Sequence, residues 1–122
     1  MRVLIVEDEP IIAMHLAMLV AELGHEVCAT AASAAGAIAS ATAHNPDVIL
    51  MDIRLAQGSS GIDAARDLHA QQARRCIFLS ANLDAPTRAA LQPYEPIDFV
   101  GKPVLRIALQ RALKKAEGPT DL

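Results

Sequence analysis

The sequence is poor in aromatic residues: it has no tryptophan, one tyrosine and two phenylalanines. Hydrophobic residues still make up 52% of its 122 positions, so any core must be built from aliphatic side chains. The length suits one domain with a single core and is too short for two. The composition is that of an ordinary soluble globular domain.

The sequence also lacks a long apolar segment, because polar residues soon interrupt every apolar run. No stretch could span a bilayer, and we expect no membrane partner. Met1 leads directly into the strand-like run RVLIV, without the basic and apolar regions of a signal peptide. These features predict a cytoplasmic protein.

Positive charge is not in excess: the formal net charge is −3 and the isoelectric point is near 5.7. This balance argues against direct nucleic-acid binding, which normally needs a basic surface. Cys28 and Cys76 each lie in an apolar strand-like run, as buried small hydrophobic residues do. No nearby cysteine or histidine has metal-ligand spacing, so neither a metal pair nor a disulfide is expected.

Short apolar runs alternate with segments of helical periodicity along the whole chain. Runs that are apolar throughout are typical of a parallel sheet covered on both faces, and the alternation predicts a doubly wound α/β fold. We predict one domain over residues 1–118, a turn-rich loop over 56–61 and a tail over 119–122. The predicted strands are 3–6, 27–31, 48–51, 76–79 and 97–100; the predicted helices are 11–23, 34–43, 62–71, 86–91 and 104–117.

Helix-end signals support these boundaries. Pro10 suits a first helical turn, Gly24 suits the position after a helix, and Ser33 suits an N-cap. Helical spacing places Ile11 among the apolar positions of the first helix and Leu105 on the apolar face of the last.

Chemically reactive side chains follow four of the predicted strands. In open α/β sheets, ligands bind beyond the carboxyl ends of the strands. Glu7 and Asp8 follow the first strand, Asp52 the third, Ser80 the fourth and Lys102 the fifth. We therefore expect three carboxylates, a hydroxyl and an ammonium group to meet at one edge of the sheet.

Three adjacent carboxylates require a cation, and an all-oxygen ligand set favours Mg²⁺ over zinc. A lysine and a hydroxyl are suited to the remaining oxygens of a phosphoryl group. An aspartate in this setting can act as a nucleophile and form an aspartyl phosphate.

With these residues in place, the chain closely resembles the receiver domains of two-component response regulators. The resemblance covers nearly all of the chain, through VLIVEDEP, DVILMDIRL, CIFLSA and FVGKP. It implies a flavodoxin-like (βα)5 fold with a five-stranded parallel sheet in the order 2-1-3-4-5. In that order two strands separate Cys28 from Cys76, which further disfavours a disulfide.

The resemblance also implies a role for each matched residue. Asp52 is the phosphoacceptor, Asp8 a direct Mg²⁺ ligand, and Glu7 acts beside it through water. The main-chain carbonyl of Arg54 is a further metal ligand, and Lys102 and Ser80 bind the phosphoryl group. Phe99 is the aromatic residue that turns inward as Ser80 moves, and Pro103 follows a cis peptide.

Two positions depart from the family pattern. Arg54 stands where a small or amide side chain is common, and Asn82 holds the equivalent place after Ser80. In the family these positions tune how fast water attacks the acyl phosphate. We hypothesise that Arg54 covers or pairs with the phosphoryl group and changes its lifetime.

The resemblance implies a signalling switch and not an enzyme. Such a switch at most catalyses its own phosphorylation and dephosphorylation. A histidine kinase or histidine phosphotransfer protein would phosphorylate Asp52, and the surface of the fourth helix, fifth strand and fifth helix would change. A downstream protein or an output domain would respond, and dimerisation on phosphorylation is left open. Two alternatives stand: a pseudo-receiver that binds partners without phosphorylation, and a phosphatase-type enzyme using an aspartyl phosphate.

Overall fold

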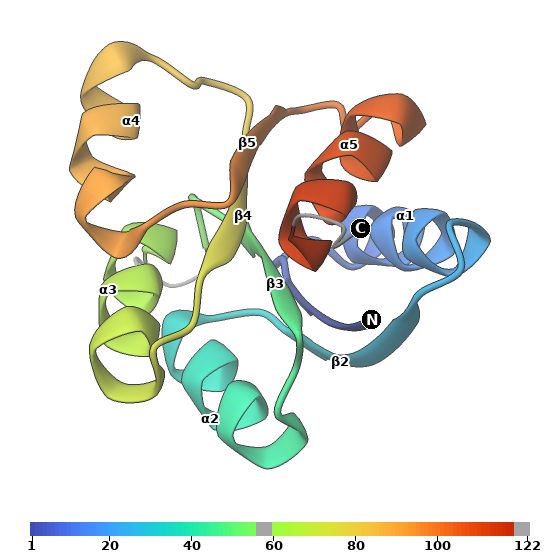
Figure 1. Cartoon of the computed structure of the whole chain (residues 1–122), viewed down its shortest axis with the longest axis horizontal. Coiled ribbons are helices and arrows are strands. Elements are labelled where there is room, and N and C mark those ends of the chain that lie inside the picture. The colour runs from blue at the N-terminus through green and yellow to red at the C-terminus, as the bar shows by residue number, and fades with distance from the viewer. Residues whose placement is uncertain (56–59, 119–122) are drawn as a thin grey trace.

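A computed structural model describes residues 1–55 and 60–118 (Figure 1). Its five strands form one parallel sheet in the order β2-β1-β3-β4-β5, which confirms the predicted flavodoxin-like α/β fold. The strands are β1 (Arg2–Val6), β2 (Glu26–Ala31), β3 (Val48–Asp52), β4 (Cys76–Ser80) and β5 (Asp98–Gly101). The helices are α1 (Pro10–Glu22), α2 (Ala34–His44), α3 (Gly61–Gln72), α4 (Ala85–Leu91), the 3-10 turn η1 (Gln92–Tyr94) and α5 (Arg106–Glu117).

Helices cover both faces of the sheet. Figure 1 shows α1 and α5 on one side and α2, α3 and α4 on the other. Successive residues of β1 point to opposite faces: Val3 and Ile5 pack with α1 and α5, whereas Leu4 and Val6 pack in the other core. Both faces of the sheet are therefore covered, which explains why the central strands β1, β3 and β4 are almost entirely apolar.

Local signals set both ends of α1 and the start of α2 as predicted. Pro10 is the first residue of α1, and Gly24, at a φ of 88°, follows the end of that helix. The Ser33 hydroxyl accepts a hydrogen bond from the Gly36 N–H at 3.1 Å and so caps α2.

Two apolar positions of the predicted helices are exposed, and the placement of Leu105 on the apolar face of the last helix was wrong. Ile11 is 81% exposed, because the core face of α1 is formed by residues nearer its middle and end. Leu105 is 63% exposed, because α5 begins at Arg106 instead of 104, so Leu105 is the N-cap and lies outside the helical periodicity. The core face of α5 consists of Leu109, Ala112 and Leu113.

The connection between β3 and α3 is closed by main-chain contacts. The Gly61 N–H donates to the Ile53 carbonyl at 2.8 Å, and Arg54 pairs with Ser60 as an isolated antiparallel bridge. Four residues of the predicted loop over 56–61 (56–59) and the predicted tail over 119–122 lie outside the described residues.

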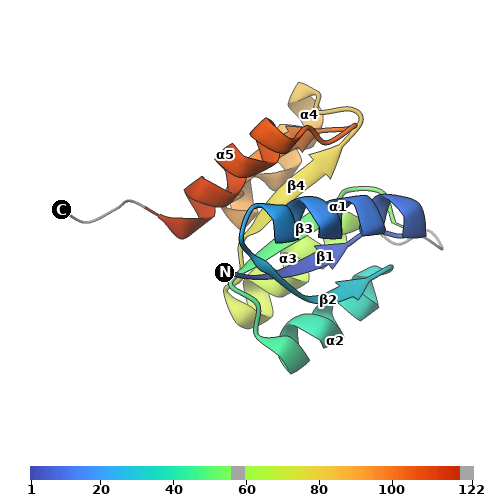
Figure 2. The same ribbon diagram turned by 90° about the vertical axis from the view of Figure 1, so that its right-hand side faces the viewer.

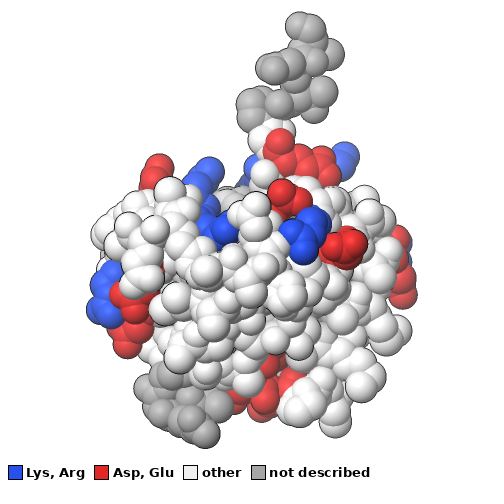
Figure 3. Space-filling view, turned by 90° about the horizontal axis from the view of Figure 1, so that it is seen from below, with Lys and Arg blue, Asp and Glu red and all other residues white. Residues whose placement is uncertain are grey.

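Charged side chains of both signs are interspersed on the face seen in Figure 3, around a broad area without charge. Helix α2, with the sequence AAGAIASATAH, has no acidic residue, lysine or arginine.

Among the described residues, no helix is both long and apolar enough to cross a membrane. Cys28 and Cys76 are free; Cys76 is buried and Cys28 is half-buried.

Candidate functional site

The carboxyl ends of the strands border a cleft of about 360 Å³. Because parallel strands end at one edge of the sheet, they bring together residues far apart in sequence, and Figure 2 shows the strand arrows directed to the same side. The residues that line the cleft are Glu7, Asp8, Glu9, Ile12, Asp52, Arg54, Leu55, Ser80, Ala81, Asn82 and Lys102.

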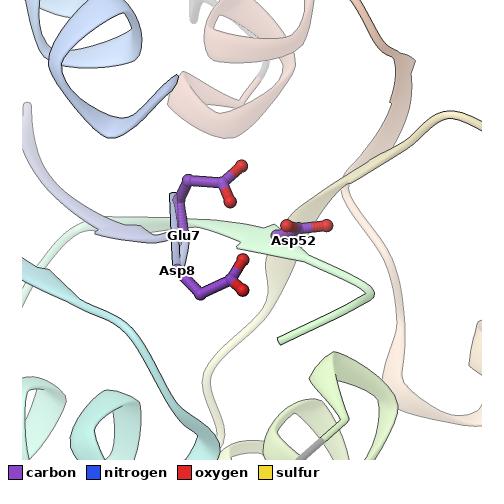
Figure 4. Close-up of side chains that lie close together, drawn as sticks. All are labelled: Glu7, Asp8 and Asp52. Carbon is purple, nitrogen blue, oxygen red and sulfur yellow. The ribbon is translucent and has the colours of Figure 1, made fainter. Parts of the chain in front are cut away.

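Three carboxylates meet at this cleft. Glu7 and Asp8 follow β1 and point toward Asp52, the last residue of β3 (Figure 4). One oxygen of each lies within 4.8 Å of the others. Glu7 is 4% and Asp52 5% exposed, so their charges are largely removed from water and must be balanced locally.

Lys102 supplies part of that balance. Its Nζ lies 2.6 Å from Glu7 Oε1 and 3.0 Å from Asp52 Oδ2. Burial alone would lower the pKa of Lys102, but the hydrogen bonds and charges of Glu7 and Asp52 raise the pKa above its ordinary value. The side chain is therefore a fixed cation between two carboxylates.

The backbone holds these side chains in place. The Lys102 N–H donates to the Ser80 carbonyl at 2.9 Å, and the peptide bond from Lys102 to Pro103, where the sequence predicted a cis bond, is cis. The second oxygen of Asp52, Oδ1, accepts from the Arg54 N–H at 3.1 Å. Glu7 Oε2 accepts from the Glu9 N–H at 3.2 Å.

The oxygen set suits a hard divalent cation. The cluster offers only carboxylates, without cysteine or histidine, and this set fits Mg²⁺ better than zinc. Lys102 already neutralises one of the buried carboxylates, so a divalent ion would balance the excess negative charge that remains.

The Ser80 hydroxyl is engaged by the loop that follows β4. It accepts from the Asn82 N–H at 3.0 Å and donates to the Asn82 carbonyl at 3.1 Å. Asn82 Nδ2 donates in turn to Asp84 Oδ2 at 3.3 Å. The hydroxyl therefore lies at the cleft while both of its hydrogen-bonding functions are occupied by the main chain of Asn82.

Phe99 lies outside the cleft lining. It pairs with Phe78 in the adjacent strand, and the two rings stack with centroids 5.9 Å apart. The structure thus brings seven of the predicted site residues to one cleft and places Phe99 in the layer between the sheet and α4. The seven are Glu7, Asp8, Asp52, Arg54, Ser80, Asn82 and Lys102.

Two residues near the site were not predicted to have a role. Gly61, the first residue of α3, packs directly against the main chain of Asp52. Arg88 of α4 lies over the Phe99 ring, with its guanidinium carbon 4.8 Å from the ring centroid. Gly61 follows a capping serine and Arg88 lies on a short helix, and neither sequence context indicates a contact with Asp52 or Phe99.

Comparison with known proteins identifies the family. A profile of the response regulator receiver domain matches residues 3–114, nearly the whole chain. The chain belongs to this family, which is a family of signalling modules.

The relatives extend this result. The chain is 46% identical over 81 residues to the phyllosphere-induced regulator PhyR of Methylorubrum extorquens. These 81 residues cover 66% of this chain and 30% of that protein. It is 33% identical over 123 residues to the transcriptional regulatory protein KdpE of Mycobacterium tuberculosis, covering 94% of this chain and 54% of that protein. It therefore spans about a third to a half of these two relatives.

Solved structures agree. The receiver domain of PhyR from Erythrobacter litoralis is 37% identical, with a TM-score of 0.80 over 99% of this chain and 95% of that one. The receiver domain of a modulated diguanylate cyclase from Desulfovibrio desulfuricans is 30% identical, with a TM-score of 0.85 over 94% of this chain and 91% of that one.

Proposed function

We propose that this chain is a phosphoacceptor switch of a two-component phosphorelay, in which Asp52 accepts a phosphoryl group from a histidine kinase or histidine phosphotransfer protein in the cytoplasm. The observation that carries the proposal is the position of the Asp52 carboxylate. It lies at an open cleft, paired with the Lys102 ammonium and close to the carboxylates of Glu7 and Asp8.

In the transfer step, an Asp52 carboxylate oxygen attacks the phosphorus of a phosphohistidine. A new P–O bond forms as the P–N bond breaks, and the histidine of the donor leaves with the bonding electrons and takes up a proton. The Lys102 ammonium, at 3.0 Å from Asp52 Oδ2, is placed to pair with a phosphoryl oxygen. The Arg54 N–H fixes the other carboxylate oxygen.

Asp8 and Asp52 would hold Mg²⁺ directly, with the main-chain carbonyl of Arg54, and Glu7 would act through water. When bound, Mg²⁺ neutralises negative charge that develops on the phosphoryl oxygens. Water attack on the phosphoaspartate releases inorganic phosphate and restores the Asp52 carboxylate, which resets the switch.

The phosphoryl group carries about −1.5 to −2 charges in place of the single charge of the Asp52 carboxylate, so the cleft gains up to about one negative charge. Ser80 would then donate its hydroxyl proton to a phosphoryl oxygen, and Phe99 would turn inward. These changes would alter the surface of α4, β5 and α5, which we propose as the face read by a downstream protein or an output domain. Phosphotransfer profiling against the histidine kinases of the source organism would identify the donor.

The direct test is phosphorylation of the purified chain by acetyl phosphate, followed by intact mass. We expect the mass to rise by one phosphoryl group with Mg²⁺, and not to rise with EDTA or in Asp52→Asn. Asp63→Asn, an exposed aspartate on α3, is the matched control and should be phosphorylated like the wild type.

Two results would contradict the proposal. Absence of any mass gain with Mg²⁺ would favour a pseudo-receiver that binds partners without phosphorylation. Sustained turnover of p-nitrophenyl phosphate would favour a phosphatase-type enzyme.

A further inference from the structure

The loop that holds the Ser80 hydroxyl is hydrogen-bonded to the start of α4. Asn82 binds Ser80 through its main chain and Asp84 through its side chain. Asp84 is the N-cap of α4, and its Oδ1 accepts from the Thr87 N–H at 2.9 Å. Residues 80–87 are therefore linked by side-chain hydrogen bonds from the cleft to the first turn of α4.

Arg88 continues this link to Phe99. Its Nε donates to the Leu83 carbonyl at 3.0 Å, which fixes the guanidinium to the same loop. The guanidinium carbon lies 4.8 Å from the centroid of the Phe99 ring, the geometry of a cation–π contact. The same ring also stacks on the buried Phe78. Phe99 is thus held between Phe78 and Arg88.

The Ser80 hydroxyl has one proton, which it cannot donate fully to the Asn82 carbonyl and to a phosphoryl oxygen at the same time. To donate to an oxygen on Asp52, its hydroxyl must release the Asn82 carbonyl. Asn82 is exposed, so water can take the place of the hydroxyl, and the loop from Ala81 to Asp84 is released from Ser80. Arg88 is bonded to that loop at Leu83, so movement of the loop also moves its guanidinium.

We propose that Arg88 is a positioning residue that holds Phe99 in its unphosphorylated place and is withdrawn when Ser80 exchanges Asn82 for the phosphoryl group. The inference rests on the proposed function, because it needs Ser80 to move toward phosphorylated Asp52. It goes beyond the proposed function because it names Arg88 of α4 as the group that opposes the inward turn of Phe99 in β5.

Fluorine NMR can follow Phe99 alone, because the chain has only two phenylalanines. Protein labelled with 4-fluorophenylalanine gives one resonance for Phe78 and one for Phe99, and Phe99→Leu assigns them. Mg²⁺ with beryllium fluoride, a stable mimic of the phosphoryl group, defines the switched position of the Phe99 resonance.

In Arg88→Met, the Phe99 resonance should move toward the switched position without beryllium fluoride. The rate of phosphorylation by acetyl phosphate should rise roughly two- to fivefold, the change in population expected on loss of an exposed cation–π contact. Arg88→Lys retains a cation and should lie closer to the wild type in both measurements. Arg66→Met removes an exposed arginine of α3 that is paired with Asp63 and Asp67, and should leave both unchanged.

A general loss of stability would lower the folded fraction and with it the rate of phosphorylation, whereas loss of the proposed restraint on Phe99 raises the rate, so the rate separates the inference from a merely structural role. An unchanged or lower rate in Arg88→Met overturns the inference, whatever happens to the chemical shift. Equal behaviour of Arg88→Lys and Arg88→Met also overturns it. If wild-type protein gains no phosphoryl group, the proposed function fails, and that failure is distinguished from the previous two because it appears before any variant is compared.

Discussion

Gly61 packs its α-carbon against the main chain that carries Asp52. A Cβ added at Gly61 would lie 2.9 Å from the Asp52 carbonyl carbon and 2.8 Å from Ile53 Cα, and closer still to the Asp52 carbonyl oxygen. All three atoms belong to the backbone of the strand end, so no flexible side chain can yield. The absence of a side chain at position 61 therefore lets α3 begin directly beside the proposed phosphoacceptor.

Gly61→Ala should lower the free energy of unfolding by about 1–3 kcal/mol, as expected when a methyl group is forced into a packed site. It should also slow phosphorylation, because relief of the clash must shift the backbone of Asp52. Urea unfolding and intact mass after acetyl phosphate treatment measure the two effects.

Gly101→Ala is the matched control, since a Cβ there meets nothing within 4 Å. Its free energy of unfolding should change by less than about 0.5 kcal/mol. Similar losses in both variants would contradict the close approach at Gly61.

Lys102→Met keeps most of the apolar length of the side chain but removes the cation between Glu7 and Asp52. Two buried carboxylates would then repel each other without a cation between them, and we expect a loss of about 1–3 kcal/mol in the free energy of unfolding. Mg²⁺ should restore more stability to this variant than to the wild type, because its charge replaces the missing ammonium.

The contrasting variant is Lys115→Met, which removes an exposed lysine that is paired with the half-buried Asp98 at 3.2 Å. Exposed pairs contribute about 0–1 kcal/mol, so its loss should be smaller and insensitive to Mg²⁺. A Mg²⁺ response in Lys102→Met no larger than that of Lys115→Met would argue against a cation site at the three carboxylates.

The two cysteines should differ in reactivity. Burial raises the pKa of the Cys76 thiol to about 12, and the side chain is 1% exposed. Because a raised pKa delays ionisation, almost no Cys76 thiolate forms in the folded protein at pH 8. Iodoacetamide at pH 8 should therefore modify only the half-buried Cys28 in the folded chain and both cysteines in concentrated urea. Alkylation of folded Cys28→Ser would contradict this.

The fold was predictable because the central strands β1, β3 and β4 are apolar on both faces and because α1 and α2 have end signals of their own. Pro10, Gly24 and Ser33 act within a few residues of chain, so their effects can be predicted from the local sequence. Leu105 was misplaced because apolar spacing continues past the true start of α5, and periodicity alone does not show where a helix begins.

The composition of the cleft was predictable for a topological reason: the carboxyl ends of parallel strands meet at one edge, whatever lies between them in sequence. Contacts between separate elements were not predictable in this way. The approach of Gly61 to Asp52 and of Arg88 to Phe99 depends on how α3 and α4 pack on the sheet. Neither residue stands at the end of a strand.

Arg54 provides a test of how long the proposed phosphorylated state lasts. Its N–H binds Asp52 Oδ1, and this contact survives any substitution other than proline. Its side chain is exposed at the cleft, where a guanidinium can pair with phosphoryl oxygens and hinder water. Arg54→Ala should therefore shorten the half-life of the phosphoaspartate roughly two- to fivefold, the rate equivalent of an exposed ion pair.

Arg54→Lys should recover only part of that half-life, because an ammonium group cannot form the two parallel hydrogen bonds of a guanidinium. Arg106→Ala, which removes an exposed arginine paired with Glu22 of α1, is the control for loss of positive charge elsewhere. Loss of phosphate is followed by intact mass after removal of acetyl phosphate, at equal Mg²⁺. If Arg54→Ala and wild type decay at the same rate, the side chain does not shield the phosphoryl group, and the Arg54 main chain alone contributes to the site.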